Sequence, residues 1–257
     1  MPRLTISNFV AYNPLTFVQI ILLIFLYMTT FRPILSTNEI YHLFNRSIGK
    51  EEVLKDKIYL RKILKIVNYY RFRQRISLSD FNNLAPNLQQ DYLKTITINV
   101  PLIDIFVFSF MPNHYHFLAK QLQDKGISLF LSNIQNSFAK NYNLINDRNG
   151  SLFDHSFKAK RIANSEEFIH VSRYIHINHV TAGIISFEQL LTYSWSSLPV
   201  YLASGNPQGS LHSFASQFIN TKSILDHFKT PEKYLKFLKN NVNYQRKLHK
   251  IKRLLLD

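Results

Sequence analysis

The chain has 257 residues and a formal net charge of +15, from 31 Lys and Arg against 16 Asp and Glu. At 46% hydrophobic it can form one substantial core, and its charge favours a polyanionic partner, either nucleic acid or an anionic membrane surface. The absence of cysteine excludes disulfides, thiolate chemistry and cysteine-ligated zinc, and the six glycines form neither a GxGxxG nor a Walker pattern.

The N-terminal segment is uncharged over residues 4–31, and residues 15–28 are nearly all apolar. This apolar stretch is shorter than the roughly 18–20 residues of a membrane-spanning helix, and no small-residue cleavage site follows it. Three interpretations stay open: a true start at Met28, so that residues 1–27 are not part of the native protein, a membrane anchor, or a cleaved signal. The first is favoured, and a membrane partner is expected only if residues 4–31 are present and inserted.

Strands and helices alternate along the rest of the chain. Alternating or β-branched runs predict strands, at residues 41–45, 104–110, 114–121 and 157–162. Apolar residues at helical spacing predict helices, at residues 51–70, 128–142 and 164–183, with further helices near 231–240 and 244–256. Polar stretches with turn-forming residues predict loops, at residues 71–100 and 199–216.

The order of these elements predicts the fold class. Met111-Pro112-Asn113 is a turn of hairpin length between the second and third strands. Strand, helix, hairpin, helix, strand and helix in succession are typical of an α+β sandwich, in which helices pack on one face of an antiparallel sheet.

The helix expected from residue 164 has clear start and stop signals. Asn164 is placed to cap it, with Glu167 at the third helical position as in a capping box, and Gly183 is a plausible stop. Its apolar stripe is expected to face the sheet, and consists of Phe168, Val171 and Ile175.

Two histidines in the third strand are candidate metal ligands. Residues two apart on a strand share a face, so His114 and His116 present both imidazoles together while Tyr115 points away. Two adjacent imidazoles form half of a divalent-metal site. For an isolated pair, two hydrogen-bonded structural histidines are the more common outcome, so further ligands and a nucleophile are needed.

The capped helix offers such groups. Tyr174 and Asn178 are four residues apart and stack on one helical face, beside the stripe that faces the sheet. A half-buried packing role for Tyr174 is the alternative. Three further histidines of this helix are expected on its solvated or nucleic-acid-facing surface: His170, His176 and His179.

Together these residues resemble a known family. The run from Met111 to Leu118, MPNHYHFL, is similar to the histidine-hydrophobe-histidine (HUH) motif of single-tyrosine transposases, and most similar to the REP-associated tyrosine transposases. Further similar blocks follow in the family's order: Tyr41–Arg46, Gly150–Phe153, Phe157-Lys158, Arg173–Asn178 and Tyr193–Ser197. The resemblance covers about residues 38–200.

The resemblance implies an RRM-like or ferredoxin-like fold and a metal-dependent reaction on DNA. It implies that Tyr174 is the nucleophile, that His114 and His116 bind the metal, and that Asn178 completes the metal site. Mg²⁺ and Mn²⁺ both suit such ligands and phosphate oxygens, and no small-molecule cofactor is expected. Cleavage of single-stranded or hairpin DNA would leave a 5′-phosphotyrosine and a free 3′-OH, as in DNA transposition.

DNA contacts and domain limits are also expected. Lys158, Lys160 and Arg161 are candidates to hold phosphates, with an ordinary solvated strand edge as the alternative. The expected domains are a catalytic domain at 38–200 and a basic helical extension at 201–257. A cytoplasmic, nucleoid-associated protein is expected, and monomer and homodimer both stay open.

The sequence departs from the family pattern at several positions. His179 follows Asn178 where the family usually has proline, Ser47 follows Arg46 where glycine is usual, and Ser156 replaces a common basic residue. These departures leave open a domesticated copy that binds DNA without cutting it. An unrelated metal hydrolase ranks last, because Asp104 and Asp124 supply few acidic ligands.

Overall fold

The computed structural model describes residues 34–154, 156–202 and 210–242. The segment 1–27, the helix expected at 244–256 and the basic C-terminal run lie outside these residues. Within the described ranges, no helix is both long and apolar enough to cross a membrane.

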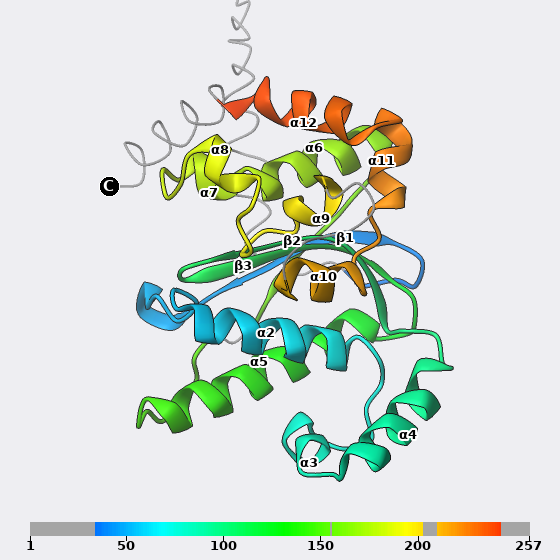
Figure 1. Ribbon diagram of the computed structural model, residues 1–257, viewed down its shortest axis with the longest axis vertical. Helices are drawn as coiled ribbons and strands as arrows, with labels where there is room; N and C mark the ends of the chain where they lie inside the picture. Colours follow the sequence, from blue (N-terminus) through cyan, green and yellow to red (C-terminus); the bar gives the residue numbers. More distant parts are fainter. Residues whose placement is uncertain (1–33, 155, 203–209, 243–257) are drawn as a thin grey trace, which may run out of the picture. The chain divides into compact units, whose positions relative to one another are not determined.

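An antiparallel sheet in the order β2-β3-β1-β4 forms the centre of the described part (Figure 1). Its strands are β1 Ile40–Arg46, β2 Ile103–Met111, β3 His114–Gln121 and β4 Lys158–Arg161. The predicted strands and the hairpin between β2 and β3 are confirmed to within one or two residues at each end.

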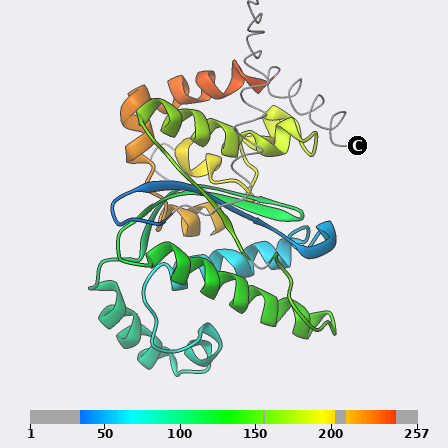
Figure 2. The same cartoon turned by 180° about the vertical axis from the view of Figure 1, so that it is seen from behind.

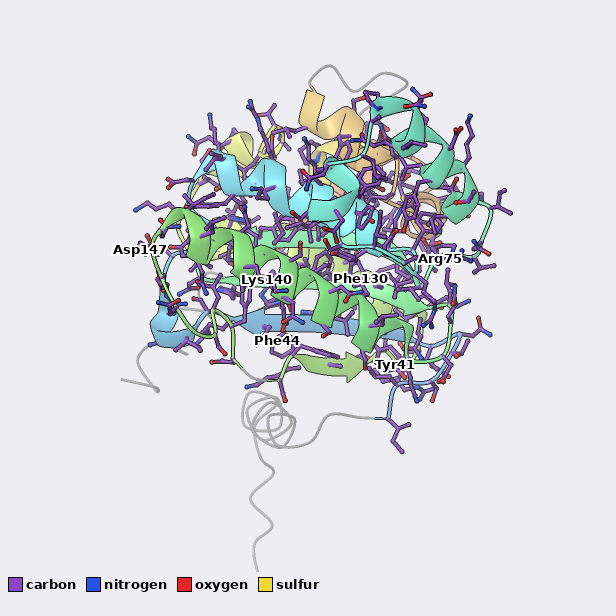
Figure 3. The ribbon with its side chains drawn as sticks, turned by 90° about the horizontal axis from the view of Figure 1, so that it is seen from below. Tyr41, Phe44, Arg75, Phe130, Lys140 and Asp147 are labelled. Carbon is purple, nitrogen blue, oxygen red and sulfur yellow. The ribbon has the colours of Figure 1, made fainter. Side chains whose placement is uncertain are left out.

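Two helices cover one face of this sheet. They are α2, Lys57–Tyr70, and α5, Gly126–Ile145, which pack against each other below the sheet in Figure 1. Figure 3 views this face, with Phe130 and Lys140 marking α5 and Tyr41 and Phe44 marking β1. The succession β1-α2-β2-β3-α5-β4 with this strand order is a ferredoxin-like arrangement, so the predicted α+β class is confirmed.

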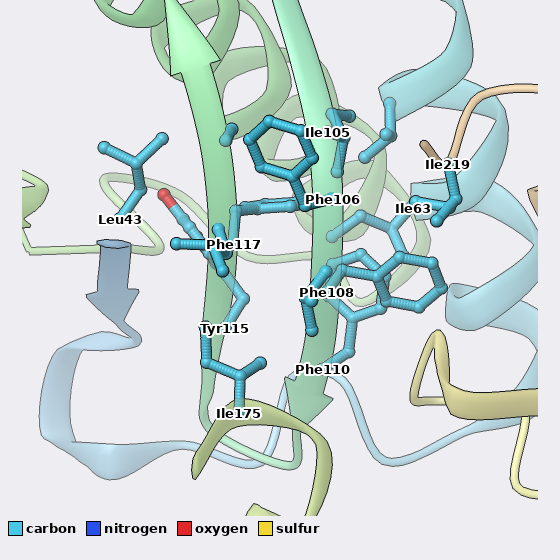
Figure 4. Close-up of a cluster of buried hydrophobic side chains, with 14 of the residues drawn as sticks. Leu43, Ile63, Ile105, Phe106, Phe108, Phe110, Tyr115, Phe117, Ile175 and Ile219 are labelled. Carbon is cyan, nitrogen blue, oxygen red and sulfur yellow. The ribbon is translucent and has the colours of Figure 1, made fainter. Parts of the chain in front are cut away.

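The main core lies between the sheet and these two helices. Tyr115 and Phe117 of β3 are fully buried beside the aromatic side chains of β2, as Figure 4 shows. Fully burying one such side chain contributes roughly 1.5–3 kcal/mol. Tyr115 and Phe117 therefore belong to a core on the side of β3 that faces away from the two histidines.

A second helical layer covers the opposite face (Figure 2). Its first helix, α6, spans Ser165–His176 and packs on β2 and β3, and α12, Pro231–Lys239, packs on α6. The other helices after β4 are α7 Asn178–Thr181, α8 Phe187–Leu190, α9 Leu198–Leu202, α10 Ser210–Ser216 and α11 Lys222–Phe228. Of these, α10 lies on the same side of the sheet as α2 (Figure 1).

The outer edge of β2 is closed by the chain that follows α8. Phe110 N–H donates to Trp195 O at 2.8 Å, and Asn220 N–H donates to Ile105 O at 2.9 Å. Unpaired backbone N–H and C=O groups at a sheet edge can pair with a strand of another chain. These two hydrogen bonds occupy such groups at the edge of β2. They also join residues beyond 200 directly to the sheet.

Two loop predictions are wrong. Residues 71–100 contain α3, Leu78–Asn82, and α4, Pro86–Thr97, and the segment 199–216 contains α10 and most of α9. Leu88, Tyr92 and Ile96 of α4 are spaced four residues apart and form an apolar stripe, but the polar residues around them and Pro86 favoured a loop. Pro86 stands in the first turn of α4, where proline starts a helix and does not break it. A short 3₁₀ turn, η1, spans Ile48–Lys50.

Candidate active site

His114 and His116 lie on the same face of β3, the strand between β2 and β1. His114 pairs with Arg46 of β1 and Met111 of β2, and His116 pairs with Phe44 and Ser109. The two imidazole ring centroids are 5.0 Å apart, with planes at 82°. The shared face that strand alternation predicts is therefore observed.

Tyr115 points to the opposite face, also as expected. It is fully buried, and its hydroxyl accepts a hydrogen bond from Gln135 Nε2 of α5. Burial raises the pKa of this phenol above its ordinary value. Tyr115 is thus a core residue on the other side of the sheet from the histidines.

The hydrogen bond at His114 decides which ring nitrogen is free. His114 Nδ1 is 2.6 Å from Asn113 Oδ1, and Asn113 Nδ2 donates to Lys50 O at 3.3 Å, which orients the amide. Because an amide oxygen only accepts, Nδ1 carries the proton and donates. The lone pair of His114 is consequently on Nε2, as in a histidine held ready for a metal.

His116 is held by a second histidine, from β1. His42 Nε2 is 2.9 Å from His116 Nδ1, and both rings are buried. The other ring nitrogen, His116 Nε2, is buried without a hydrogen-bond partner in the described part of the chain. His42 is not recognisable as part of this site from the sequence, because its contact with His116 depends on the pairing of β1 with β3, which strand alternation does not reveal.

All three imidazoles are neutral at physiological pH. Burial lowers the pKa of His42 to about 3, with a smaller contribution from Lys160. Burial also lowers the pKa of His114 to about 4, assisted by Arg46, and lowers the pKa of His116 well below its usual value. Neutral imidazole is the form that binds metal ions.

Tyr174 of α6 lies over these histidines. Its ring centroid is 5.8 Å from that of His116 and 5.9 Å from that of His42, in edge-to-face contacts. The buried side chains Phe168 and Ile175 hold α6 on the sheet, as the apolar stripe predicts. Burial raises the pKa of the Tyr174 phenol, and Arg46 opposes this shift.

The start of α6 follows the sequence prediction, and its end does not. Asn164 Oδ1 caps the helix by accepting from Glu167 N–H at 2.8 Å, and Gly183 adopts a positive φ of 74° after α7. Between them, however, Ile177 leaves helical geometry, with φ −89° and ψ 6°. Every residue from Ile175 to Thr181 is buried, so apolar periodicity carries no information about this break.

Asn178 begins α7 as a buried residue, 6% exposed, and its Nδ2 has no partner in the described part of the chain. His179 anchors α7 to β2. Its Nε2–H donates to Phe110 O at 3.0 Å, and its Nδ1 is 3.3 Å from Ser109 Oγ. Ser109 pairs with His116, so α7 is attached next to the histidine strand.

The expected surface position of the helix histidines is wrong for two of them. His176 and His179 are fully buried, whereas His170 is exposed and lies 3.7 Å from Glu166. His176 bonds to Tyr234 of α12 at 2.7 Å and to Ser197 at 2.9 Å. Burial lowers the pKa of His176 to about 3 and that of His179 to about 4, so both are neutral structural groups.

The three basic residues expected to hold DNA differ in their environments. Lys158 and Lys160 pair with Phe44 and His42, and therefore share the histidine face, whereas Arg161 pairs with Tyr41 on the other face. Lys160 Nζ is 2.6 Å from Glu167 Oε1, and Arg161 forms two hydrogen bonds to Glu39, at 2.9 and 2.8 Å. Lys158 is exposed and forms no ion pair with a described residue.

Arg46 is a further basic residue at this site that the sequence analysis did not single out. It is exposed at the end of β1, directly across from His114, and it influences the pKa of His114, His116 and Tyr174. Among the described residues no carboxylate forms an ion pair with it. A free guanidinium beside the histidines is suited to bind a phosphate.

The described residues contain no group of three or more His, Cys, Asp or Glu side chains that could hold a metal ion. His114, His116 and Asn178 are not such a group, because the third residue is an asparagine. His114 has its Nδ1 engaged, and His116 Nε2 and the Asn178 amide are buried without partners. Turning an amide over exchanges its nitrogen for an oxygen. Imidazole nitrogens and amide oxygens are both ligands that divalent cations accept.

No family model and no curated protein matches the sequence. Among solved structures, the chain is similar to that of a REP-associated tyrosine transposase bound to a REP hairpin. The sequence identity is 15%, the TM-score is 0.48, and the match covers 71% of this chain and 92% of the other. A TM-score below 0.5 at this identity does not establish a function.

Proposed function

We propose that this chain is a metal-dependent nickase and transposase that cleaves and rejoins single-stranded DNA through a 5′-phosphotyrosine intermediate. The observation that carries the proposal is the position of Tyr174, whose ring lies 5.8 Å from that of His116, on the sheet face shared by both candidate metal ligands. A nucleophile beside a metal site and free basic groups is the arrangement that phosphodiester transfer requires.

His114 and His116 would hold Mg²⁺ or Mn²⁺ through their Nε2 atoms, with Asn178 as the third protein ligand. A bound divalent ion would supply Lewis acidity to a phosphate oxygen. The protein's own contribution is to keep the two imidazoles neutral and fixed in orientation, through Asn113 at His114 and His42 at His116.

Tyr174 is the proposed nucleophile. Its Oη forms a bond to phosphorus, the bond from phosphorus to the 3′ oxygen breaks, and the leaving oxygen takes up a proton to become a 3′-OH. The phenol proton passes to water. Because the phosphotyrosine keeps the energy of the broken diester, a DNA hydroxyl can reverse the step and join strands without ATP.

The substrate phosphates are proposed to lie between Arg46 and Lys158. Both side chains are exposed, stand on the histidine face and have no carboxylate partner among the described residues. Lys160 and Arg161 can join them only by exchanging Glu167 and Glu39 for phosphate. Arg46 and Lys158 are therefore the primary contacts in this proposal.

We also propose that residues 38–200 form the catalytic domain and that 201–257 extend it. Tyr234 of α12 is fully buried against His176 of α6, so the described part of this extension supports the helix that carries Tyr174. Hairpin or other single-stranded DNA is the proposed partner, with a nucleoid-associated location following from it. The molecular mass of the protein–DNA complex, measured by size-exclusion chromatography with light scattering, would distinguish a monomer from a homodimer.

The proposal is tested by incubating the protein with end-labelled hairpin DNA and Mn²⁺, followed by denaturing electrophoresis. We expect a denaturation-resistant adduct that EDTA prevents. Tyr174→Phe should abolish the adduct while leaving DNA binding intact. Tyr115→Phe, on the face of β3 opposite the two histidines, should retain the adduct. Binding without any adduct, across a panel that includes the flanks of the protein's own gene, would instead support a DNA-binding protein without strand transfer.

A further inference from the structure

His42 forms a buried connection between β1 and β3 that the proposed reaction does not use directly. Its Nε2 is 2.9 Å from His116 Nδ1, and the two rings stack with centroids 5.1 Å apart and planes at 25°. The same ring packs edge-on against Tyr174 at 5.9 Å. His42 therefore contacts both a candidate metal ligand and the proposed nucleophile.

Two proton arrangements are possible in this pair, and they differ in what they leave at His116 Nε2. If His42 Nε2 carries the proton and donates, His116 keeps its own proton on Nε2, where the structure offers no acceptor among the described residues. If His116 Nδ1 carries the proton and donates, Nε2 has a lone pair. A buried N–H without an acceptor is the costlier of the two, so the second arrangement is favoured.

We propose that His42 is a positioning residue: by accepting the hydrogen bond from His116 Nδ1, it keeps the Nε2 lone pair of His116 free to bind the divalent cation. The inference rests on the proposed metal site. It gives the two ligands equivalent support, because Asn113 Oδ1 holds Nδ1 of His114 in the same way. Partners of this kind orient the ring and raise ligand basicity.

The first test compares His42→Leu with His42→Gln in the full chain. Leucine fills the space without accepting a hydrogen bond, whereas the glutamine Oε1 can accept near the position of the histidine Nε2. Mn²⁺ binding without DNA, measured by electron paramagnetic resonance, should weaken about 10–100-fold in His42→Leu. His42→Gln should recover most of this loss. Phe44→Leu, which changes a neighbour of both rings without a hydrogen bond, should bind as the wild type does.

A second measurement needs no substitution at His42. Nitrogen-15 NMR of the imidazoles in the wild-type chain should show the proton of His116 on Nδ1, with the resonance assigned by its loss in His116→Gln. A proton on Nε2 would overturn the inference. So would a folded His42→Leu variant that binds Mn²⁺ with wild-type affinity, or a wild-type chain that does not bind Mn²⁺.

These outcomes are separable from the fate of the proposed function. A wild-type adduct whose dependence on Mn²⁺ is unchanged in His42→Leu overturns the inference and leaves the nickase intact. Mn²⁺ binding that depends on His42, in a protein that forms no adduct, supports the inference and contradicts the nickase.

Discussion

At the scale of single residues, Arg46 distinguishes this site from the rest of a strongly basic surface. Lys160 and Arg161 have carboxylate partners at 2.6 and 2.8 Å, whereas Arg46 has none among the described residues and lies across from His114. A cation that is already paired must give up its partner to bind phosphate. Arg46 does not, so we expect it to contribute most to holding the cleaved phosphodiester.

Arg46→Gln should therefore slow adduct formation by about 10–100-fold, the loss of one charge-assisted hydrogen bond of roughly 1.5–3 kcal/mol. Arg46→Lys should recover part of the rate, because lysine restores the positive charge but cannot form the bidentate hydrogen bonds of a guanidinium. Initial rates of adduct formation at fixed Mn²⁺ provide the measurement. Arg61→Gln, at an exposed position on α2, is the control, and an equal loss there would remove the special role of Arg46.

The site could be predicted from the sequence only in part at this scale. Side chains of a strand alternate between its two faces, so His114 and His116 share a face regardless of which strands pair with β3. His42 and Arg46 join them only because β1 pairs with β3 in a register that puts Arg46 opposite His114, and no local pattern encodes that register. Strand alternation alone places Arg161 on the face opposite to that of Lys158 and Lys160. The prediction that all three residues hold phosphates did not take this into account.

At the scale of elements, α7 depends on one side chain. His179 connects it to β2 through Phe110 O and Ser109 Oγ, directly beside the histidine strand. The connection holds Asn178, the first residue of α7, after the break at Ile177. An alanine cannot make these bonds, so the attachment of α7 to β2 depends on the His179 imidazole.

We expect His179→Ala to lower the free energy of unfolding by about 1–3 kcal/mol, because it leaves buried polar groups of β2 without a partner. It should also weaken Mn²⁺ binding through the loss of a fixed Asn178. Urea denaturation followed by circular dichroism measures the first effect. Gln90→Ala, at an exposed position on α4, should change stability by no more than about 0.5 kcal/mol. Equal stability of the two variants would contradict this account of α7.

The strands and longer helices could be predicted where the spacing of apolar residues matches the face that is buried. The strands and the helices α2, α5 and α12 follow from such patterns. The short helices α3, α9 and α10 have five to seven residues, fewer than two turns, and periodicity cannot be read from them. In the segment Ile175–Thr181 every side chain is buried, so apolar periodicity does not show where the helix breaks. In α4 the apolar spacing is present, but nearly every side chain is solvated and the polar composition favoured a loop.

At the scale of the whole molecule, the net charge of +15 predicts that the proposed DNA binding depends on salt. Most of these charges are spread over the surface, and those near the histidine face should make the phosphate contacts. For single strands the slope of log affinity against log salt changes by about 0.7 for each phosphate contact. The slope therefore counts contacts, and variants show which residues make them.

Lys158→Gln should reduce this slope by about 0.7, because Lys158 is exposed on the histidine face without a carboxylate partner among the described residues. Fluorescence anisotropy of a labelled single-stranded oligonucleotide, titrated at several salt concentrations, gives the value. Lys94→Gln is the matched control, since Lys94 is an exposed lysine of α4 paired with Asp91. A slope that changes equally in both variants would mean that binding is distributed over the surface and is not centred on this site.

The most direct test of the account is to identify the residue that carries the DNA. The adduct formed with Mn²⁺ is digested with a protease and a nuclease, and tandem mass spectrometry locates the remaining phosphonucleotide. The account predicts a 5′-phosphate linkage on Tyr174, the tyrosine whose ring lies against His42 and His116. A linkage on any other tyrosine, or no linkage in a protein that binds the hairpin and Mn²⁺, would contradict it.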